Sequence, residues 1–389
     1  MGAGHLNPAR FEALLDANPG LAEVELSNYG EMFLNPGLTE ILRAAYSRQV
    51  VLHADNGVNL NHAPDEVLAA LVQYRMRSLT VSIDGASQES YSRYRVRGEF
   101  EMVLGNIRKL NEYKRQQQTV FPMVCWQFIV FGHNEDELAA ARKMAAELGM
   151  SFRPKISWDD DVSPVRNRDL VRIQTGLPGT RQEHYQATGT AYLRDICHQL
   201  WQSPVLNWDG RVMGCCRNYW GDFGGNAFDD GLEAALRSPG LEHARRMLMG
   251  QAEAMPEVPC TTCDLYQTMR QDGSWIGKRE LVAGAGSVIL GIVIDEGRTE
   301  ATHCDVFVSP GGVDRLKLAS PPAAQRYRIG DQQRIAVAIP AGVEHTVYAL
   351  PKRLDPSYRK RYPALPAVTV TVTAEARPGL KDVVVRLGG

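Results

Sequence analysis

The sequence predicts an α/β protein built on a parallel sheet, followed by a cysteine-rich module and a small all-β domain. Over the first 156 residues, short apolar runs alternate with helical patterns of 10 to 15 residues, which indicates βαβ units and a parallel sheet. Five of the seven cysteines lie between Cys197 and Cys263. From about Gly273, helical periodicity gives way to short β-like runs separated by Gly, Pro and Asp. These runs are typical of a small all-β sandwich.

The elements of the α/β part follow one another in regular order. A helix over 7–17 begins at Asn7-Pro8, an N-cap followed by proline in the first turn. Val24 and Leu26 alternate with glutamates, which predicts a strand over 22–27. The same reasoning predicts, in chain order, a helix over 38–45, a strand over 50–54, a helix over 65–73, a strand over 79–83, a helix over 102–110, a strand over 123–131, a helix over 135–148 and a strand over 152–156. Residues 157–195 lose this periodicity, which predicts a linker into the cysteine-rich module.

Polar dipeptides and tripeptides follow four of the predicted strands. They are Gly30-Glu31, Asn56-Gly57, Asp84-Gly85 and Gly132-His133-Asn134. Each alone is also an ordinary turn sequence. In parallel α/β folds, however, the chemistry lies at the carboxyl ends of the strands. Four such segments at successive strand ends therefore indicate a binding site at this edge of the sheet.

The cysteines form a pattern of two separated pairs. Cys197 and Cys215 flank Gly210 in a C-x12-G-x4-C arrangement, and Cys216 follows directly. Cys260 and Cys263 close the pattern as C-x2-C. Four thiolates divided in this way suit a tetrahedral sulfur site for zinc or an iron–sulfur cluster. The alternatives are cysteines that pack as small apolar side chains and a disulfide framework. An odd number of cysteines in a long chain without a secretory signal pattern disfavours disulfides.

Composition narrows the classes of partner. The chain has 389 residues, enough for two or three domains, with 44% hydrophobic and 23% charged residues. A formal net charge of −2 gives no electrostatic case for binding nucleic acid or an anionic membrane surface. The most apolar run, 282–294, is too short to cross a bilayer. We therefore expect a protein of the reducing cytoplasm with no nucleic-acid or membrane partner.

Taken together, these segments resemble radical S-adenosylmethionine (radical SAM) enzymes that carry a SPASM-type auxiliary-cluster domain. The stretch LSNYGEMFLNPGLTEIL is similar to the family's second barrel strand, which ends at a Gly-Glu pair. The family's third, fourth and fifth barrel strands are similar, in that order, to HADNG, LTVSIDGASQESYSRYRVRGEF and FIVFGHNEDEL. The stretch CHQLWQSPVLNWDGRVMGCC, together with CTTC, is similar to the family's auxiliary-cluster module. The resemblance covers about residues 7–266 and leaves the β-rich tail unmatched.

The resemblance implies a fold and a domain division. The fold would be a partial (β/α)6 TIM-like barrel that lacks its first strand, followed by a SPASM-type module and the all-β domain. The radical SAM half-barrel would take residues 1–165, the auxiliary [4Fe–4S] domain 166–272 and the β-rich domain 273–389.

The resemblance also implies site residues. Gly30 and Glu31 would hold the amino group of S-adenosylmethionine, Ser82 and Asp84 would lie near its ribose or the substrate, and Asn134 would lie along the adenosine. Asn56 belongs to the turn after the third barrel strand. The auxiliary cluster would be bound by four of five cysteines, with Cys216 able to substitute for Cys215: Cys197, Cys215, Cys216, Cys260 and Cys263. No catalytic residue is identifiable.

One departure from the family pattern concerns its defining motif. The family binds a catalytic [4Fe–4S] cluster through C-x3-C-x2-C, before the Gly-Glu pair. Here no cysteine precedes Cys125, which lies inside a predicted strand. We expect that the sequence is truncated before this motif; the alternative is a naturally degenerate relative.

Two functional hypotheses follow. In the first, the complete protein cleaves S-adenosylmethionine to a 5′-deoxyadenosyl radical that abstracts hydrogen from a peptide, protein or small-metabolite substrate. The auxiliary cluster then relays an electron, and a flavodoxin or ferredoxin is the electron donor. In the second, the chain is a non-catalytic binding protein whose four cysteines hold zinc or an inert iron–sulfur cluster. The missing motif favours the second hypothesis, and the resemblance favours the first.

Overall fold

The computed structural model describes residues 2–21, 23–48, 50–119, 121–157, 161–277 and 281 in full, and the backbone of seven strands between 287 and 386. The chain divides into two compact units. The first comprises Met1–Ala17, Val24–Tyr46 and Leu52–Ile276, and the second comprises Asn18–Glu23, Ser47–Val51 and Gly277–Gly389. The predicted division at 165 and 272 stays a prediction. Within the described residues, no helix is both long and apolar enough to span a membrane.

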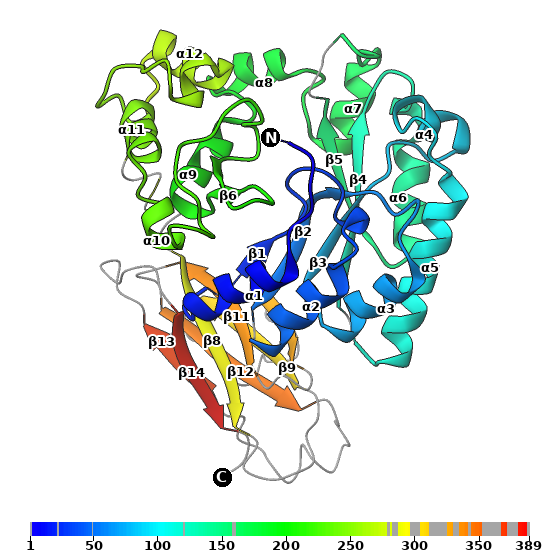
Figure 1. Cartoon of the computed structure of the whole chain (residues 1–389). Coiled ribbons are helices and arrows are strands. Elements are labelled where there is room, and N and C mark those ends of the chain that lie inside the picture. The colour runs from blue at the N-terminus through cyan, green and yellow to red at the C-terminus, as the bar shows by residue number, and fades with distance from the viewer. Residues whose placement is uncertain are drawn as a thin grey trace. The chain divides into compact units, whose positions relative to one another are not determined.

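A five-stranded sheet organises the first unit (Figure 1). Its strands are β1 (Glu23–Glu25), β2 (Val51–Val58), β3 (Ser78–Ser82), β4 (Met123–Val130) and β5 (Ser151–Ile156). They lie side by side in sequence order, and β2 to β5 pair in parallel. The prediction of a mixed α/β chain with a parallel sheet is therefore confirmed.

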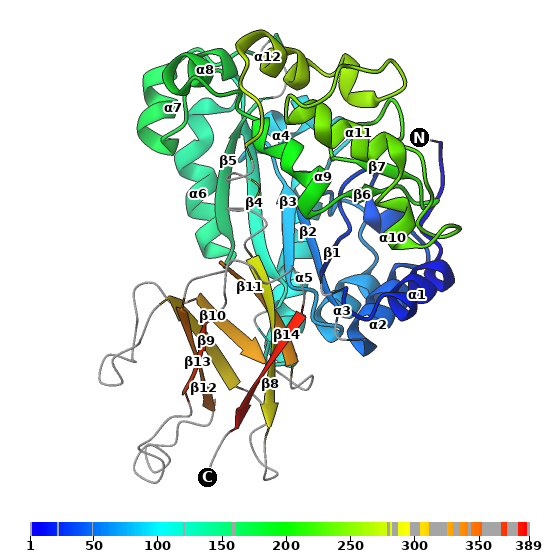
Figure 2. The ribbon, with the colours of Figure 1, turned by 90° about the vertical axis from the view of Figure 1, so that its left-hand side faces the viewer.

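Helices between the strands cover one face of this sheet (Figure 2). They are α2 (Leu38–Ser47), α3 (Asp65–Gln73), α5 (Phe100–Gln116) and α6 (Leu138–Glu147), while α1 (Pro8–Ala17) precedes β1 and the short α4 (Gln88–Tyr94) was not predicted. Aromatic rings fill the interface: Trp126 of β4 meets Phe100 of α5 edge-on, with ring centroids 6.3 Å apart. Trp126 also donates a hydrogen bond from Nε1 to the Ile83 carbonyl at 2.7 Å, so its polar atom is satisfied in the core.

The opposite face of the sheet is polar. Side chains alternate between the two faces of a sheet along each strand. Trp126 and Phe128 pack toward the helices, so Gln127 between them points to the opposite face. We call this surface the polar face; it carries Thr80 and Ser82 of β3, Cys125 and Gln127 of β4, and Arg153 and Lys155 of β5. Several of these polar side chains are buried: Thr80 is 1% exposed, Gln127 4% and Ser82 6%.

The strand β2 does not end where the sequence predicted. It continues past Ala54 to Val58, with an irregularity in its pairing to β3 between these two residues. The predicted turn at Asn56-Gly57 is thus a bulge inside the strand. Gly57 has φ +120°, and a Cβ atom there would lie 2.4 Å from Ser82 Oγ and 3.0 Å from Gln127 Nε2. Only glycine satisfies both the backbone conformation and this close approach.

We expect Gly57→Ala to destabilise the protein more than Gly30→Ala. Both glycines have positive φ, +120° and +75°, but a Cβ at position 30 would meet no atom within 4 Å. The left-handed backbone should cost about 1 kcal/mol at either position, and the contact with Ser82 should add about 1–3 kcal/mol at position 57. Urea unfolding measures both losses; equal losses would show that Ser82 moves aside freely.

The prediction of a linker over 157–195 was wrong, because two helices lie in it. They are α7 (Arg168–Thr175) and α8 (Arg181–Thr188). Each begins at a side-chain cap, Asn167 or Thr180, and ends at a left-handed glycine. Only Val171 of α7 is buried, and no residue of α8 is. These helices are stabilised by their ends, so apolar periodicity could not reveal them.

The cysteine-rich module follows within the same unit. It contains a two-stranded antiparallel hairpin of β6 (Val205–Leu206) and β7 (Val212–Gly214). The helical elements around it are short: η3 (Arg194–His198), α9 (Gln199–Gln202), α10 (Leu232–Ala235), α11 (Pro239–Leu248), η4 (Pro259–Thr262) and α12 (Asp264–Asp272). The longer helices α11 and α12 bury apolar side chains, among them Leu241, Met247 and Tyr266, so apolar packing contributes to the stability of the module.

Seven strands are described in the second unit: β8 (Ser287–Asp295), β9 (Cys304–Pro310), β10 (Gln325–Ile329), β11 (Arg334–Pro340), β12 (Glu344–Pro351), β13 (Ala367–Thr371) and β14 (Leu380–Arg386). Four form a sheet in the order β10-β9-β12-β13, and three form a sheet in the order β11-β8-β14. The assignment of residues 273–389 to an all-β domain stays a prediction.

Candidate cluster and cofactor site

Four of the predicted ligand cysteines line one pocket. Cys197 lies in η3, Cys215 directly follows β7, Cys260 lies in η4, and Cys263 ends that turn. The cavity at this pocket is small, about 20 Å³. The two pairs thus converge in space, although Cys215 and Cys260 are 45 positions apart in the sequence. All four thiols are free of disulfides.

The rest of the pocket wall is largely apolar, with side chains contributed by Leu200, Phe223, Leu248, Pro259 and Leu265. Burial is deep: Cys197 is 7% exposed and Cys260 is 9% exposed. Desolvation therefore raises the thiol pKa of both residues, and it raises that of Cys215 to about 11. The pKa of Cys263 is also raised by burial.

Cys216 lies outside the pocket wall. Its backbone N–H donates to Gln199 Oε1 at 2.8 Å. Its thiol interacts electrostatically with the ammonium of Lys155, which lies on the polar face of the sheet. Burial raises the pKa of this thiol, and Lys155 acts in the opposite direction. The structure thus gives the two adjacent cysteines different surroundings, and Cys215 is the one that shares a pocket with the other three.

The donor set of this pocket fits an iron–sulfur cluster or zinc, because both are held by four thiolates. Among the described residues, no group of three or more His, Cys, Asp or Glu side chains is close enough to hold a metal ion. The four cysteines share one pocket, but their sulfur atoms are not arranged as a formed metal site. Their role as ligands stays a prediction.

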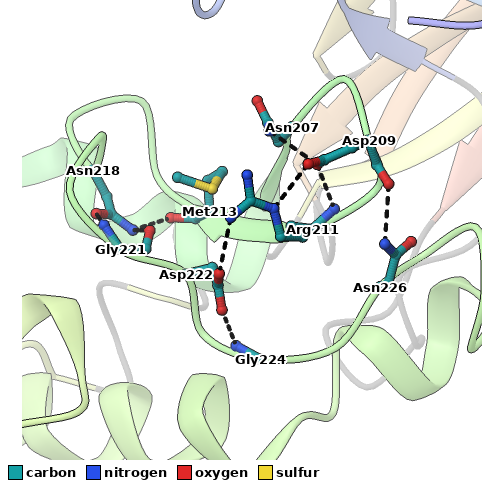
Figure 3. A network of polar contacts seen from close by, with 9 residues as sticks. All are labelled: Asn207, Asp209, Arg211, Met213, Asn218, Gly221, Asp222, Gly224 and Asn226. Atoms are coloured by element: carbon teal, nitrogen blue, oxygen red, sulfur yellow. Dashed lines mark hydrogen bonds and ion pairs between the residues drawn. The ribbon is translucent and has the colours of Figure 1, made fainter. Parts of the chain in front are cut away.

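A network of polar contacts shapes the loop that carries Cys215 (Figure 3). Asp209 accepts hydrogen bonds from Asn207 Nδ2 and from the Arg211 backbone and side chain, which closes the β6–β7 turn. Beyond β7, Asn218 is 2% exposed and donates from Nδ2 to the carbonyls of Met213 and Gly221, both at 2.8 Å. One buried amide thus joins the backbone on both sides of Cys215.

We expect Asn218→Ala to weaken retention of a metal group without unfolding the sheet. The variant leaves the buried carbonyls of Met213 and Gly221 without their donor, at a cost of about 1–3 kcal/mol for each unpaired group. Iron content after exposure to a chelator measures the effect. The control is Asn226→Ala, whose amide holds the Asp209 carbonyl on the far side of the hairpin. If Asn218→Ala keeps its iron as well as the control does, the loop does not depend on this amide.

Gly30 and Glu31 lie where the chain leaves β1. Glu31 accepts hydrogen bonds from the backbone N–H of Phe33 at 3.3 Å and of Asn59 at 2.6 Å, and so it caps η1 (Met32–Leu34). Burial raises the pKa of Glu31, while these backbone donors and Arg95 lower it. A carboxylate accepts about four hydrogen bonds, so the Glu31 side chain keeps acceptor capacity for an ammonium group.

Asp84, which follows β3, is completely buried. Its Oδ2 pairs with Arg95 Nε at 2.7 Å, and its Oδ1 accepts from the Ile129 backbone N–H at 2.7 Å. Burial raises the pKa of Asp84, and Arg95 acts in the opposite direction. Because Arg95 also interacts electrostatically with Glu31, one guanidinium joins two of the predicted site residues.

Asn134 is also completely buried, and its amide is engaged within the protein. Nδ2 donates to the carbonyls of Asp84 at 3.1 Å and Ile129 at 2.9 Å, and Oδ1 accepts from the Phe131 N–H at 2.8 Å. The Asn134 side chain therefore joins the ends of β3 and β4. Ser82 is 6% exposed and contacts Gln127. Asn56 is exposed; its backbone N–H donates to Ser27 Oγ at 3.1 Å, and its Nδ2 donates to Asn28 Oδ1 at 3.5 Å.

Two further residues of this site were missed by the sequence interpretation. Arg95 is the charge partner of Asp84, and Glu137 accepts from the Ala86 N–H and from the hydroxyls of Ser87 and Ser90. Glu137 thereby joins the loop after β4 to the start of α4. Neither contact leaves a periodic signal, because each depends on how distant segments meet.

Comparisons with known proteins give a limited result. No protein-family model matches the chain, and no curated protein matches it. The crystal structure of Streptococcus suis SuiB bound to S-adenosylmethionine resembles it with a TM-score of 0.47 and 11% identity, over 69% of this chain and 65% of that chain. Native anSMEcpe with bound AdoMet resembles it with a TM-score of 0.45 and 11% identity, over 69% of this chain and 80% of that chain. The chain thus spans less than two thirds of the first structure's length, and the similarity concerns the fold alone.

Proposed function

We propose that the chain is an iron–sulfur protein of the radical SAM type, with one auxiliary [4Fe–4S] cluster in the cysteine pocket. The observation that carries the proposal is the convergence of Cys197, Cys215, Cys260 and Cys263 on one pocket with apolar walls. When bound there, such a cluster supplies one-electron transfer at a potential set by its ligands and surroundings. Four thiolates would complete its coordination, so the chain's own residues would bind it and exclude water from it.

The strand ends are the proposed site for S-adenosylmethionine. Glu31 retains acceptor capacity for an ammonium, and Arg95 holds the buried Asp84 carboxylate in place. Where a catalytic cluster supplies the 5′-deoxyadenosyl radical, this arrangement would support hydrogen abstraction from a substrate above the polar face. A peptide, protein or small metabolite as substrate, and a flavodoxin or ferredoxin as electron donor, are part of the same proposal.

Metal and sulfide analysis of the anaerobically purified chain tests the cluster. We expect about four iron atoms and about four acid-labile sulfides per chain, with a brown colour. One zinc and no iron would overturn the proposal and support the rival function, a non-catalytic protein whose cysteines hold zinc. The visible absorption spectrum also separates the two cases, because zinc thiolates have no visible band.

A further inference from the structure

The polar face contains an aligned row of side chains that the proposed function leaves without a role. In the parallel pairing, Ser82 of β3 lies beside Gln127 of β4, and Gln127 lies beside Arg153 of β5. Neighbouring residues of parallel strands point to the same face. Lys155, two residues after Arg153, also points to this face, beside Ile129. The row therefore places two cations next to a buried amide.

Three polar groups in this row lack partners. Gln127 is 4% exposed, and its Oε1 has no hydrogen-bond donor within the described part of the chain. The buried Nε of Arg153 has no acceptor there either. Lys155 has neither a hydrogen bond nor an ion pair to any described residue, although it is only partly exposed. An unsatisfied acceptor beside two unsatisfied donors is costly in a folded protein unless a ligand or water completes the contacts.

The charges around the row are also unbalanced. Arg153 is held in place by neutral acceptors, since its Nη2 donates to the Asp55 carbonyl at 2.6 Å and to Thr80 Oγ1 at 3.1 Å. The nearby carboxylates have other partners: Asp84 pairs with Arg95. The Asp55 carboxylate lies 3.6 Å from His53 Nδ1. Arg153 interacts electrostatically with Asp55, and Lys155 with Asp84. Neither cation forms an ion pair with a described residue, however, so two partly buried cations lie together without a directly paired counter-charge, and such a pair favours an anion.

We infer that Arg153, Lys155 and Gln127 form a subsite for a substrate carboxylate that lies beside a hydrogen-bond donor. The carboxylate accepts from Arg153 Nε and Lys155 Nζ, and the adjacent N–H or O–H donates to Gln127 Oε1. An N-acylated amino acid or a peptide C-terminus carries these two groups next to each other. The identification of the bound molecule as the substrate rests on the proposed function, whereas the binding of the carboxylate does not.

Calorimetric titration of the protein with N-acetylglycine tests the subsite. This probe has a carboxylate beside an N–H donor, and N-acetylglycinamide is its neutral counterpart. We expect N-acetylglycine to bind at least about tenfold more tightly than the amide, because charge-assisted hydrogen bonds are the stronger kind. Lys155→Gln should lower the affinity about tenfold. The matched control is Lys143→Gln on α6, whose side chain is 79% exposed, and it should leave the affinity unchanged.

Equal binding of N-acetylglycine by the Lys155 and Lys143 variants would overturn the inference, as would equal binding of the acid and the amide by the unaltered protein. A loss of S-adenosylmethionine binding in Lys155→Gln with unchanged N-acetylglycine binding would assign the lysine to the cofactor and also overturn it. Circular dichroism of both variants checks that they fold. Iron content reports on the proposed function separately, so a protein without iron that binds N-acetylglycine contradicts only that proposal.

Discussion

Cys260→Ala is expected to leave the purified protein with iron at background level. Cys260 is 9% exposed and lies in η4, where it faces the same pocket as Cys197 and Cys215. Removing one of four thiolates opens the coordination of any metal group bound there, and the methyl group of alanine offers no replacement donor. Because a bound metal group contributes its binding energy to folding, residues 197–266 should also lose stability.

The matched control is Cys216→Ala, which removes a partly buried thiol outside the pocket. Iron and sulfide analysis of the two variants, prepared in parallel, measures the difference directly. Hydrogen exchange over 197–266 should rise in the Cys260 variant alone. If the two variants hold equal iron, the assignment of ligands is wrong; if only the Cys216 variant loses iron, Cys216 replaces Cys215 as the ligand.

Apolar periodicity was sufficient to predict the sheet. β4 is an almost continuous apolar run interrupted by Gln127, and the amphipathic helices α2, α3, α5 and α6 follow their strands as expected. The same signal failed for α7 and α8, which bury almost no apolar side chain. A capping pattern, Thr180 with Glu183 three residues later, was present in the sequence and could have revealed α8.

The candidate site could be predicted only in part, because contacts between distant polar residues leave no periodic signal in the sequence. The cysteine spacing indicated a shared site, and the structure brings four of those cysteines to one pocket. The sequence left open which of the two adjacent cysteines belongs there. Arg153 and Gln127 could not be predicted as site residues, because an isolated polar residue in a strand has the same sequence signal as any solvent-facing position. Only the register of β4 against β5 places them side by side.

Asp84→Ala should lower the free energy of unfolding by about 3 kcal/mol. The Asp84 side chain is 0% exposed and its partner Arg95 is 27% exposed. Deleting one member of a buried ion pair costs about 3–5 kcal/mol, because the other charge remains without compensation. Here Arg95 gains some hydration, which keeps the loss near the lower limit, while the Ile129 N–H loses its acceptor as well.

The control for this prediction lies on the neighbouring helix. Glu89→Ala breaks an ion pair with Arg93 in which the two side chains are 82% and 55% exposed, and such pairs contribute about 0.5 kcal/mol or less. Urea unfolding of both variants, followed by far-ultraviolet circular dichroism, gives the two free energies of unfolding. Asp84→Asn should fall between them, because its amide oxygen still accepts from Ile129 but the charge is gone. A loss for Asp84→Ala no larger than for Glu89→Ala would mean that the Asp84–Arg95 pair does not hold the strand ends together, and the geometry proposed for S-adenosylmethionine binding would then lack its support.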